Sequence, residues 1–198
     1  MLIDTIDKQM IYLSNVPEQL SELIFNGFKN KFTAKLFKDS TAKDIAYLLA
    51  KYVSSSKKEQ LIIARQDDEI CGCLFYSDDQ DHSLYELIKK EYSGFMKIKV
   101  FLFFLVLEHR PVKNETYVEF LVVSDQHRRR GVGTQLIQKC KDIAITKKVT
   151  LYVAANNTSA IDLYQKNDFR TQIVQNSMLS GKIINNKKWY FMTWENLK

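Results

Sequence analysis

Residues 117–134, YVEFLVVSDQHRRRGVGT, join the strongest strand pattern of the chain to a basic run and a glycine-rich turn. Residues 117–123 are dense in aromatic and β-branched side chains, which favours a β-strand. After the turn, apolar side chains recur at helical spacing and predict a helix that runs to about residue 146. Residues 149–154 then predict a short strand. A strand, a loop, a helix and a strand in this order form a right-handed crossover, so we expect the two strands to be parallel neighbours.

The turn between this strand and this helix has the chemistry of a phosphate cradle. Gly131 and Gly133 let the backbone approach a ligand closely, and a helix start adds unpaired N–H groups and a positive dipole end. A dinucleotide-binding fingerprint would need a third glycine where the chain has Leu136, and a Walker loop would need a Gly-Lys-Ser/Thr sequence that does not occur here. Both nucleotide-binding motifs are therefore excluded at this turn.

A second motif follows at residues 157–169, which read NTSAIDLYQKNDF. Together the two motifs resemble the signature of the GCN5-related N-acetyltransferase (GNAT) family. Arg128, Gly131 and Gly133, after a strand ending at Val123, fit the family's Gln/Arg-x-x-Gly-x-Gly/Ala loop for acetyl-coenzyme A. The second stretch fits Asn-x-x-Ala-x-x-Leu-Tyr-x-x-x-Gly-Phe, and the residues that match are Asn157, Ala160, Leu163, Tyr164 and Phe169. The resemblance covers residues 117–169 and is looser before them.

One residue departs from the family pattern. Asp168 stands where the family has glycine before Phe169. Aspartate tolerates a left-handed backbone better than most residues, so we expect Asn167 and Asp168 to make the same helix-ending turn.

The resemblance implies an α/β fold: a mixed, mostly antiparallel sheet with a central splayed parallel strand pair, flanked by helices. Residues 10–13 predict a first strand, and Pro17 after Asn15 marks the start of a helix. Residues 41–44, TAKD, resemble a capping box that opens a second helix, which residues 54–56, SSS, end. Residues 61–65 and 70–76 predict a hairpin, because a polar connection of hairpin length joins two apolar runs.

Residues 83–110 form a predicted helical insert. Its first part has helical spacing, and residues 98–107 are apolar nearly all round, which is typical of a buried or covered helix. The insert either caps the core or lines a pocket. In the family it lies where relatives shape the acceptor site, so Phe103 and Phe104 are expected to form an apolar wall there. The tail predicts a loop around residues 180–181 and a final strand over residues 187–194.

The resemblance also assigns the residues that bind acetyl-coenzyme A as co-substrate. The pantetheine arm would pair with backbone groups of the strand end, main-chain N–H groups of the turn would hold the pyrophosphate, and arginine side chains would reach the phosphates of the adenosine end. Asn157 would bond the cofactor arm. The full set is Leu121, Val122, Val123, Arg128, Arg129, Arg130, Gly131, Val132, Gly133, Thr134 and Asn157. The competing interpretation of the three arginines is a solvated loop.

Two residues are candidates for the chemistry. Tyr164 would donate a proton or hydrogen bond to the departing coenzyme A thiolate, and its alternative role is that of a core tyrosine. Glu119 shares side-chain parity with Leu121 and Val123 on the splayed strand and would take the proton of the attacking amine. Its alternative is a carboxylate that faces solvent or pairs with a lysine. Relatives also place a carboxylate where this chain has Tyr152, so ordered water is a second route for the proton.

The composition is that of one ordinary globular domain. The chain has 198 residues, 45% hydrophobic and 26% charged, which excludes disordered, collagen-like and disulfide-stapled classes. No repeat or linker divides it, so we expect a single domain over residues 1–198. A formal net charge of +6 suits an anionic partner. We expect this partner not to be nucleic acid, because the sequence has no helix-turn-helix or aromatic signature.

The cysteines and the N-terminal sequence predict a cytoplasmic protein. Three cysteines, two of them in Cys71-Gly72-Cys73, give no disulfide framework, and ligands at zinc spacing are missing, so we expect no metal. The start, MLIDTIDKQM, does not have the architecture of a signal peptide. The longest apolar run, residues 100–107, is too short to span a bilayer, so we expect no membrane partner.

The sequence therefore predicts an N-acetyltransferase that moves an acetyl group from acetyl-coenzyme A to a primary amine by direct attack in a ternary complex. Cys140 lies in the apolar stripe of a helix, which argues against a covalent acetyl-cysteine route. The alternative is a non-catalytic acyl-coenzyme A sensor on the same fold. The identity of the amine and the presence of a homodimer stay open.

Overall fold

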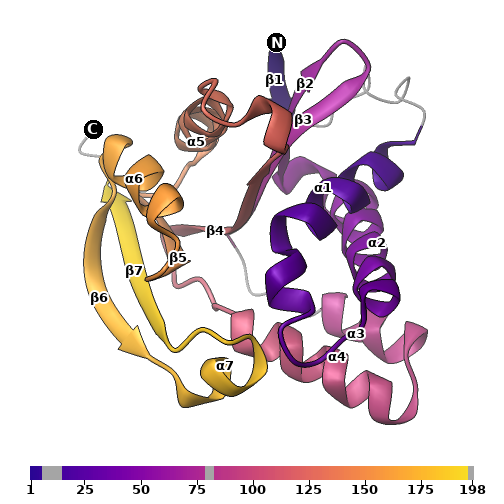
Figure 1. Cartoon of the computed structure of the whole chain (residues 1–198). Helices are drawn as coiled ribbons and strands as arrows, with labels where there is room; N and C mark the ends of the chain where they lie inside the picture. The colour runs from indigo at the N-terminus through magenta and orange to yellow at the C-terminus, as the bar shows by residue number, and fades with distance from the viewer. Residues whose placement is uncertain (6–14, 79–82, 196–198) are drawn as a thin grey trace.

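A twisted seven-stranded sheet runs through the computed structural model, which describes residues 1–5, 15–78 and 83–195 (Figure 1). The strands lie in the order β1 (Leu2–Thr5), β2 (Leu61–Gln66), β3 (Glu69–Ser77), β4 (Glu115–Val123), β5 (Lys148–Ala154), β7 (Lys188–Glu195) and β6 (Arg170–Asn176). Neighbouring strands are antiparallel except β4 and β5, which are parallel. The mixed sheet and its parallel pair confirm the predicted fold class. The strand predicted over residues 10–13 lies outside the described residues.

Helices cover both faces of the sheet. Helices α1 (Val16–Phe32) and α2 (Asp39–Ser55) lie on one face, and α5 (Val132–Ile143) lies on the other, with α6 (Thr158–Lys166) beside it (Figure 1). Alternate residues of strand β2 are buried on opposite faces of the sheet. Leu61 and Ile63 belong to the hydrophobic cluster with α1 and α2, whereas Ile62 and Ala64 belong to the cluster with α5. A strand buried on both faces has a continuous apolar sequence.

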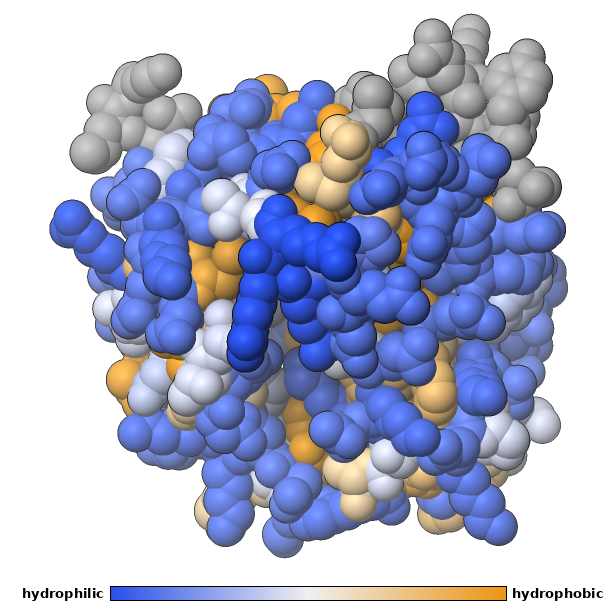
Figure 2. All heavy atoms as spheres, turned by 45° about the horizontal axis from the view of Figure 1, so that its top comes forward, coloured by the Kyte–Doolittle hydropathy of each residue, from blue (hydrophilic) through white to orange (hydrophobic). Residues whose placement is uncertain are grey.

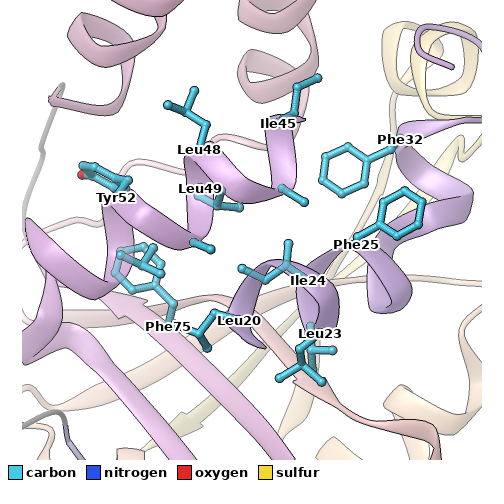
Figure 3. Close-up of a cluster of buried hydrophobic side chains, with 14 of the residues drawn as sticks. Leu20, Leu23, Ile24, Phe25, Phe32, Ile45, Leu48, Leu49, Tyr52 and Phe75 are labelled. Atoms are coloured by element: carbon cyan, nitrogen blue, oxygen red, sulfur yellow. The ribbon is translucent and has the colours of Figure 1, made fainter. Parts of the chain in front are cut away.

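Helices α1 and α2 form the larger core with the sheet. Their apolar side chains point toward one another and toward Phe75 of β3 (Figure 3). Pro17 lies in the first turn of α1, as predicted. The capping box predicted at residues 41–44 is wrong, because α2 begins at Asp39 with Lys38 at its N-cap. The Asp39 carboxylate favours this earlier start, since it lies at the positive end of the helix dipole and pairs with Lys29 of α1 at 2.8 Å.

The parallel pair β4 and β5 separates after four residues. Residues 115–118 of β4 pair with residues 148–151 of β5, but residues 119–123 have no partner on β5. On its other side, β5 stays paired with β7 through Ala154. The sheet therefore opens into a wedge between the end of β4 and the end of β5, as the splayed pair requires.

A β-bulge lies at the start of this wedge. Phe75 pairs with Phe120, but the next residue of β3, Tyr76, pairs with Val118, so Glu119 is an extra residue in β4. A bulge changes the face toward which the following side chains point. The simple alternation assumed from the sequence therefore does not hold across Glu119.

Two helices occupy the insert: α3 (Ser83–Glu91) and α4 (Gly94–Leu107). Helix α4 buries Val100 and Phe103, but Phe95 is 71% and Ile98 53% exposed. Some apolar side chains of this helix therefore face solvent rather than the core. No helix in the described part of the chain is both long and apolar enough to cross a membrane.

Two predicted boundaries differ from the structure. Helix α5 ends at Ile143 rather than near residue 146. The loop predicted around residues 180–181 is wrong, because a short helix, α7 (Met178–Ile183), lies there. The Ser177 hydroxyl caps this helix by accepting a hydrogen bond from the Ser180 N–H at 3.1 Å, a local bond that makes the turn helical.

Candidate active site

The glycine-rich turn presents backbone donors at the start of α5. Arg129 (φ 61°) and Gly131 (φ 83°) are both left-handed, and Val132 is the first residue of the helix. The Gln135 N–H makes the first helical bond, to the Gly131 carbonyl at 3.0 Å, so the N–H groups of residues 132–134 have no partner within the helix. Such a helix start is a ready site for an anion.

The basic side chains of the turn lie at the surface. Arg128, Arg129 and Arg130 are all exposed. Figure 2 turns the top of the molecule, where α5 lies in Figure 1, toward the viewer, and it shows strongly hydrophilic side chains gathered near a hollow in this face.

The Arg128 side chain is held by other residues of the loop. Its Nε donates to the Val123 carbonyl at 3.3 Å, and its guanidinium pairs with Asp125 at 2.8 Å. The buried His127 is held in turn by the Ser124 hydroxyl, 2.8 Å from its Nδ1. Arg129 and Arg130 are thus better placed than Arg128 to reach outward to a phosphate.

The two glycines of the turn are needed for different reasons. A Cβ on Gly131 would have no atom closer than 3.8 Å, so its left-handed φ is what favours glycine there. A Cβ on Gly133 would lie 3.0 Å from the Leu163 side chain, so Gly133 allows α5 to approach α6 closely.

The end of β4 offers backbone groups along the wedge. Leu121, Val122 and Val123 pair with β3 on one side and have no strand partner on the other. Their unpaired edge is suited to an extended ligand that forms hydrogen bonds as a strand would. The Val123 carbonyl already accepts a side-chain bond, from Arg128.

Asn157 is the N-cap of α6. Its Oδ1 accepts from the Ala160 N–H at 3.3 Å and from the Ser159 hydroxyl at 3.2 Å. The side chain is exposed at the edge of β5 and α6, so it holds the helix start and still faces outward.

Tyr164 is buried on the α5 side of the sheet. It is 8% exposed, and its ring lies 5.8 Å from that of Phe169. Burial raises the pKa of the Tyr164 phenol to about 12, so it is protonated at neutral pH. The turn that follows has Asp168 at φ 62°, which confirms the left-handed turn predicted for the residue that replaces glycine.

A cavity of about 330 Å³ lies on the opposite side of β4, toward α1 and α2. Many of its lining side chains are aromatic, and its walls include residues of α1, α2, β3, the insert, β4, β5 and β7. Among the residues that line it are Phe28, Phe32, Phe75, Tyr85, Phe103, Phe104, Tyr117, Phe120, Tyr152 and Trp189. None of residues 121–134 lines it. The cavity is thus separate from the glycine-rich turn, and Phe103 and Phe104 of the insert contribute to its wall.

Glu119 points into this cavity. The parity argued from the sequence is wrong: Leu121 and Val123 pack on the α5 side, whereas Glu119 lines the cavity together with Tyr117 and Phe120, because Glu119 is the bulged residue. Burial raises the pKa of the Glu119 carboxyl to about 7, although the Ser77 hydroxyl, which donates to it at 2.7 Å, opposes that shift. A carboxyl with this pKa exchanges its proton near neutrality.

Two further side chains of the cavity are not evident from the sequence. The His109 ring packs against Tyr117 at a tilt of 42°, with centroids 4.3 Å apart, and its Nε2 lies 3.2 Å from Glu115. Burial alone would raise the pKa of Glu115, but hydrogen bonds from His109, Thr150 and the Val112 N–H lower it to about 2. Lys31 of α1 also lines the cavity. No local motif distinguishes either residue, because only the packing of the insert and of α1 brings them here.

Glu119 and Tyr164 therefore lie on the two sides of the wedge. The carboxyl is on the cavity side, and the phenol is in the buried cluster of α5 and α6. The wedge between them is bounded by the open edge of β4. In the described ranges, no group of three or more His, Cys, Asp or Glu side chains could hold a metal ion.

The sequence matches known proteins over its central part. The acetyltransferase (GNAT) family matches residues 25–169. Cysteine-rich protein 2-binding protein of Mus musculus is 41% identical over 59 residues, which are 30% of this chain and 7% of that protein. The chain thus corresponds to only a small part of that relative's length.

Solved structures share the fold along nearly the whole chain. An N-acetyltransferase from Staphylococcus aureus Mu50 has a TM-score of 0.67 at 14% identity, with 98% of this chain and 100% of that chain covered. The PaiA N-acetyltransferase from Thermoplasma acidophilum, in complex with coenzyme A, has a TM-score of 0.58 at 14% identity, with 98% of each chain covered. At such identities the likeness shows the fold alone. Because the family match spans most of the sequence, the chain belongs to the acetyltransferase (GNAT) family, which implies acyl transfer from acyl-coenzyme A.

Proposed function

We propose that this chain transfers an acetyl group from acetyl-coenzyme A to a primary amine by direct attack in a ternary complex. The observation that carries the proposal is the position of Glu119. A bulge aims this carboxyl, whose pKa is about 7, into an aromatic cavity beside the opening between β4 and β5. A base of this kind is needed because an amine attacks only after it has lost its proton.

The side of the wedge toward α5 suits acetyl-coenzyme A. Unpaired N–H groups of residues 132–134 would hold the pyrophosphate, with Arg129 and Arg130 close to the adenosine phosphates. The open edge of Leu121 and Val123 would pair with the pantetheine arm. The coenzyme A found in the Thermoplasma acidophilum PaiA structure, which shares this fold, supports coenzyme A as the ligand here.

Proton transfer is divided between two residues. Glu119 accepts the proton of the amine on the cavity side, and a hydrogen bond from the Ser77 hydroxyl stabilises the carboxylate form that precedes this step. Tyr164 donates to the thiolate that leaves on the opposite side, and its pKa of about 12 keeps the proton available for this step. The reaction forms an amide bond to the acetyl carbon and breaks its bond to sulfur.

A covalent acetyl-cysteine route is not part of the proposal. Cys140 is 1% exposed, and burial raises the pKa of its thiol to about 12. The thiolate is the nucleophilic form of cysteine, so this residue cannot supply one at neutral pH.

The direct test has two stages. Calorimetric titration with acetyl-coenzyme A should show binding, and Gly131→Trp, which adds bulk at a left-handed residue of the turn, should weaken it. An amine panel with release of free thiol as the readout should then show turnover. Binding with no turnover on a broad panel would refute the enzyme and support a non-catalytic acyl-coenzyme A sensor.

A further inference from the structure

The charged side chains of the aromatic cavity are mostly paired. Glu108 accepts from Arg110 at 3.2 Å, and His109 lies 3.2 Å from Glu115. Glu119 accepts from Ser77 at 2.7 Å, and Lys57 is likewise engaged. An aromatic cavity that contains charges at low exposure normally satisfies them in this way.

Lys31 differs from these groups. Its ammonium has no carboxylate within ion-pair distance among the described residues, and it lies over two aromatic rings. The Nζ lies 4.7 Å from the centroid of Phe28 and 5.7 Å from that of Trp189. Burial lowers the pKa of Lys31 to about 8, so at pH 7 most molecules still carry the charge. A partly buried cation without an anion is a place where a ligand anion would bind favourably.

The rings around Lys31 fix its position. The Trp189 indole N–H donates to the Ser180 hydroxyl at 3.0 Å, which holds this ring at the wall of the cavity. Phe28 packs edge-on against Phe120 at 5.9 Å, and Phe120 follows Glu119 in β4. Lys31 and Glu119 thus line one cavity, with the Phe28 and Phe120 rings between α1 and β4.

We infer that the acceptor amine also carries a carboxylate and that Lys31 binds this carboxylate while Glu119 faces the amine. The inference rests on the proposed function and narrows its substrate class to small amino acids or similar amino carboxylates with an apolar body. Aromatic walls suit that body, and a cavity of about 330 Å³ lies at the small end of ligand sites.

The anion belongs to the acceptor rather than to coenzyme A. No residue of the glycine-rich turn lines this cavity, and Lys31 lies on the face of the sheet that carries α1 and α2. A single partly dehydrated ammonium matches the single charge of a carboxylate better than the double charge of a phosphate monoester, which would need further cations.

The test compares acceptors that differ only in the anion. L-phenylalanine, its amide and 2-phenylethylamine form one series, and 6-aminohexanoate, its amide and hexylamine form a second series with a longer spacing. The enzymes are the wild type, Lys31→Met, Lys31→Arg and the control Lys29→Met. Lys29 is on the same helix but pairs at the surface with Asp39, outside the cavity. The readout is kcat/KM from thiol release.

We expect the wild type to prefer the carboxylate over its amide by about tenfold or more in at least one series, the effect of one hydrogen bond to a charged group. Lys31→Met should abolish this preference, whereas Lys31→Arg and Lys29→Met should retain it. Equal use of carboxylates and amides by the wild type in both series would overturn the inference and leave the proposed function intact.

A binding measurement without turnover separates the two proposals. Calorimetry with 3-phenylpropanoate in the presence of coenzyme A should give a Kd about tenfold higher for Lys31→Met than for the wild type, and 3-phenylpropanamide should bind both alike. If this difference is found but no amine is acetylated, the carboxylate site stands and the proposed function fails. Equal binding of 3-phenylpropanoate to both proteins would refute the site itself.

Discussion

Replacing Ser77 with alanine should move the pH dependence of acetyl transfer upward. The Ser77 hydroxyl donates to Glu119 at 2.7 Å and lowers the pKa of this carboxyl, which burial otherwise raises to about 7. A hydrogen bond to a charged group contributes about 1.5–3 kcal/mol, and one pKa unit corresponds to about 1.36 kcal/mol. Removing the bond should therefore raise the pKa of Glu119 by about one to two units.

The assay measures kcat/KM for one amine across pH 5.5–9.5 in the wild type, Ser77→Ala, Ser77→Thr and Glu119→Gln. The ionisation of the amine adds the same slope to all four curves, so ratios to Glu119→Gln isolate the carboxyl. With a pKa of about 7, the ionised fraction of Glu119 rises from about one tenth at pH 6 to about nine tenths at pH 8. The ratio for the wild type should rise about tenfold over this range, and at pH 8 it should reach about 10²–10⁴.

In Ser77→Ala the same rise should lie one to two pH units higher, and Ser77→Thr, which retains a hydroxyl, should follow the wild type. A curve for Glu119→Gln with the wild-type inflection would show that another group is the base. An unchanged or lower inflection in Ser77→Ala would show that the Ser77 bond does not stabilise the carboxylate.

Stability gives a readout of Glu119 that does not depend on activity. The folded pKa of about 7 lies above the ordinary value of 4.5, so the contribution of this carboxyl to stability is fully present below pH 4.5 and is lost as pH rises through 7. Between these limits the free energy of unfolding of the wild type should fall by about 3 kcal/mol relative to Glu119→Gln. Parallel stability curves for the two proteins in urea would contradict the raised pKa.

Three other substitutions test the remaining parts of the site. Gly131→Ala should destabilise the turn by about 1 kcal/mol and weaken calorimetric binding of acetyl-coenzyme A, whereas Gly131→Asn should do so less, because asparagine tolerates a left-handed φ; equal effects would remove the conformational argument. Tyr164→Phe should lower kcat by about 10²-fold with unchanged affinity for acetyl-coenzyme A. An unchanged kcat would show that Tyr164 packs in the core and does not act as the acid. Phe104→Ala should change KM for the amine more than affinity for acetyl-coenzyme A, and equal losses would count against its place in the acceptor wall. Phe103→Ala is a poorer probe, because this ring is 2% exposed, stacks on Phe32 at 5.0 Å and should cost about 3–5 kcal/mol of stability.

Local features of the sequence predicted most of the fold. The crossover from β4 through α5 to β5, the hairpin of β2 and β3 and the left-handed turn at Asp168 all depend on residues close together in the chain. Their patterns of apolar spacing, turn residues and glycines therefore carry the information directly. The wrong capping box in α2 and the missed α7 lie at helix ends, where a single ion pair or hydroxyl bond decides the boundary.

The site divides in the same way. The sequence by itself determined the glycine-rich turn, because a left-handed φ and a helix start are properties of a few consecutive residues. Only the tertiary structure decided that Glu119 enters the cavity, since the bulge depends on how β4 pairs with β3. It also decided that Lys31 lies over Trp189, because these residues are far apart in the chain and meet only when the end of α1 approaches the start of β7. Side-chain direction across a bulge and contacts between distant segments are set by the packing of the whole core, and no local pattern encodes them.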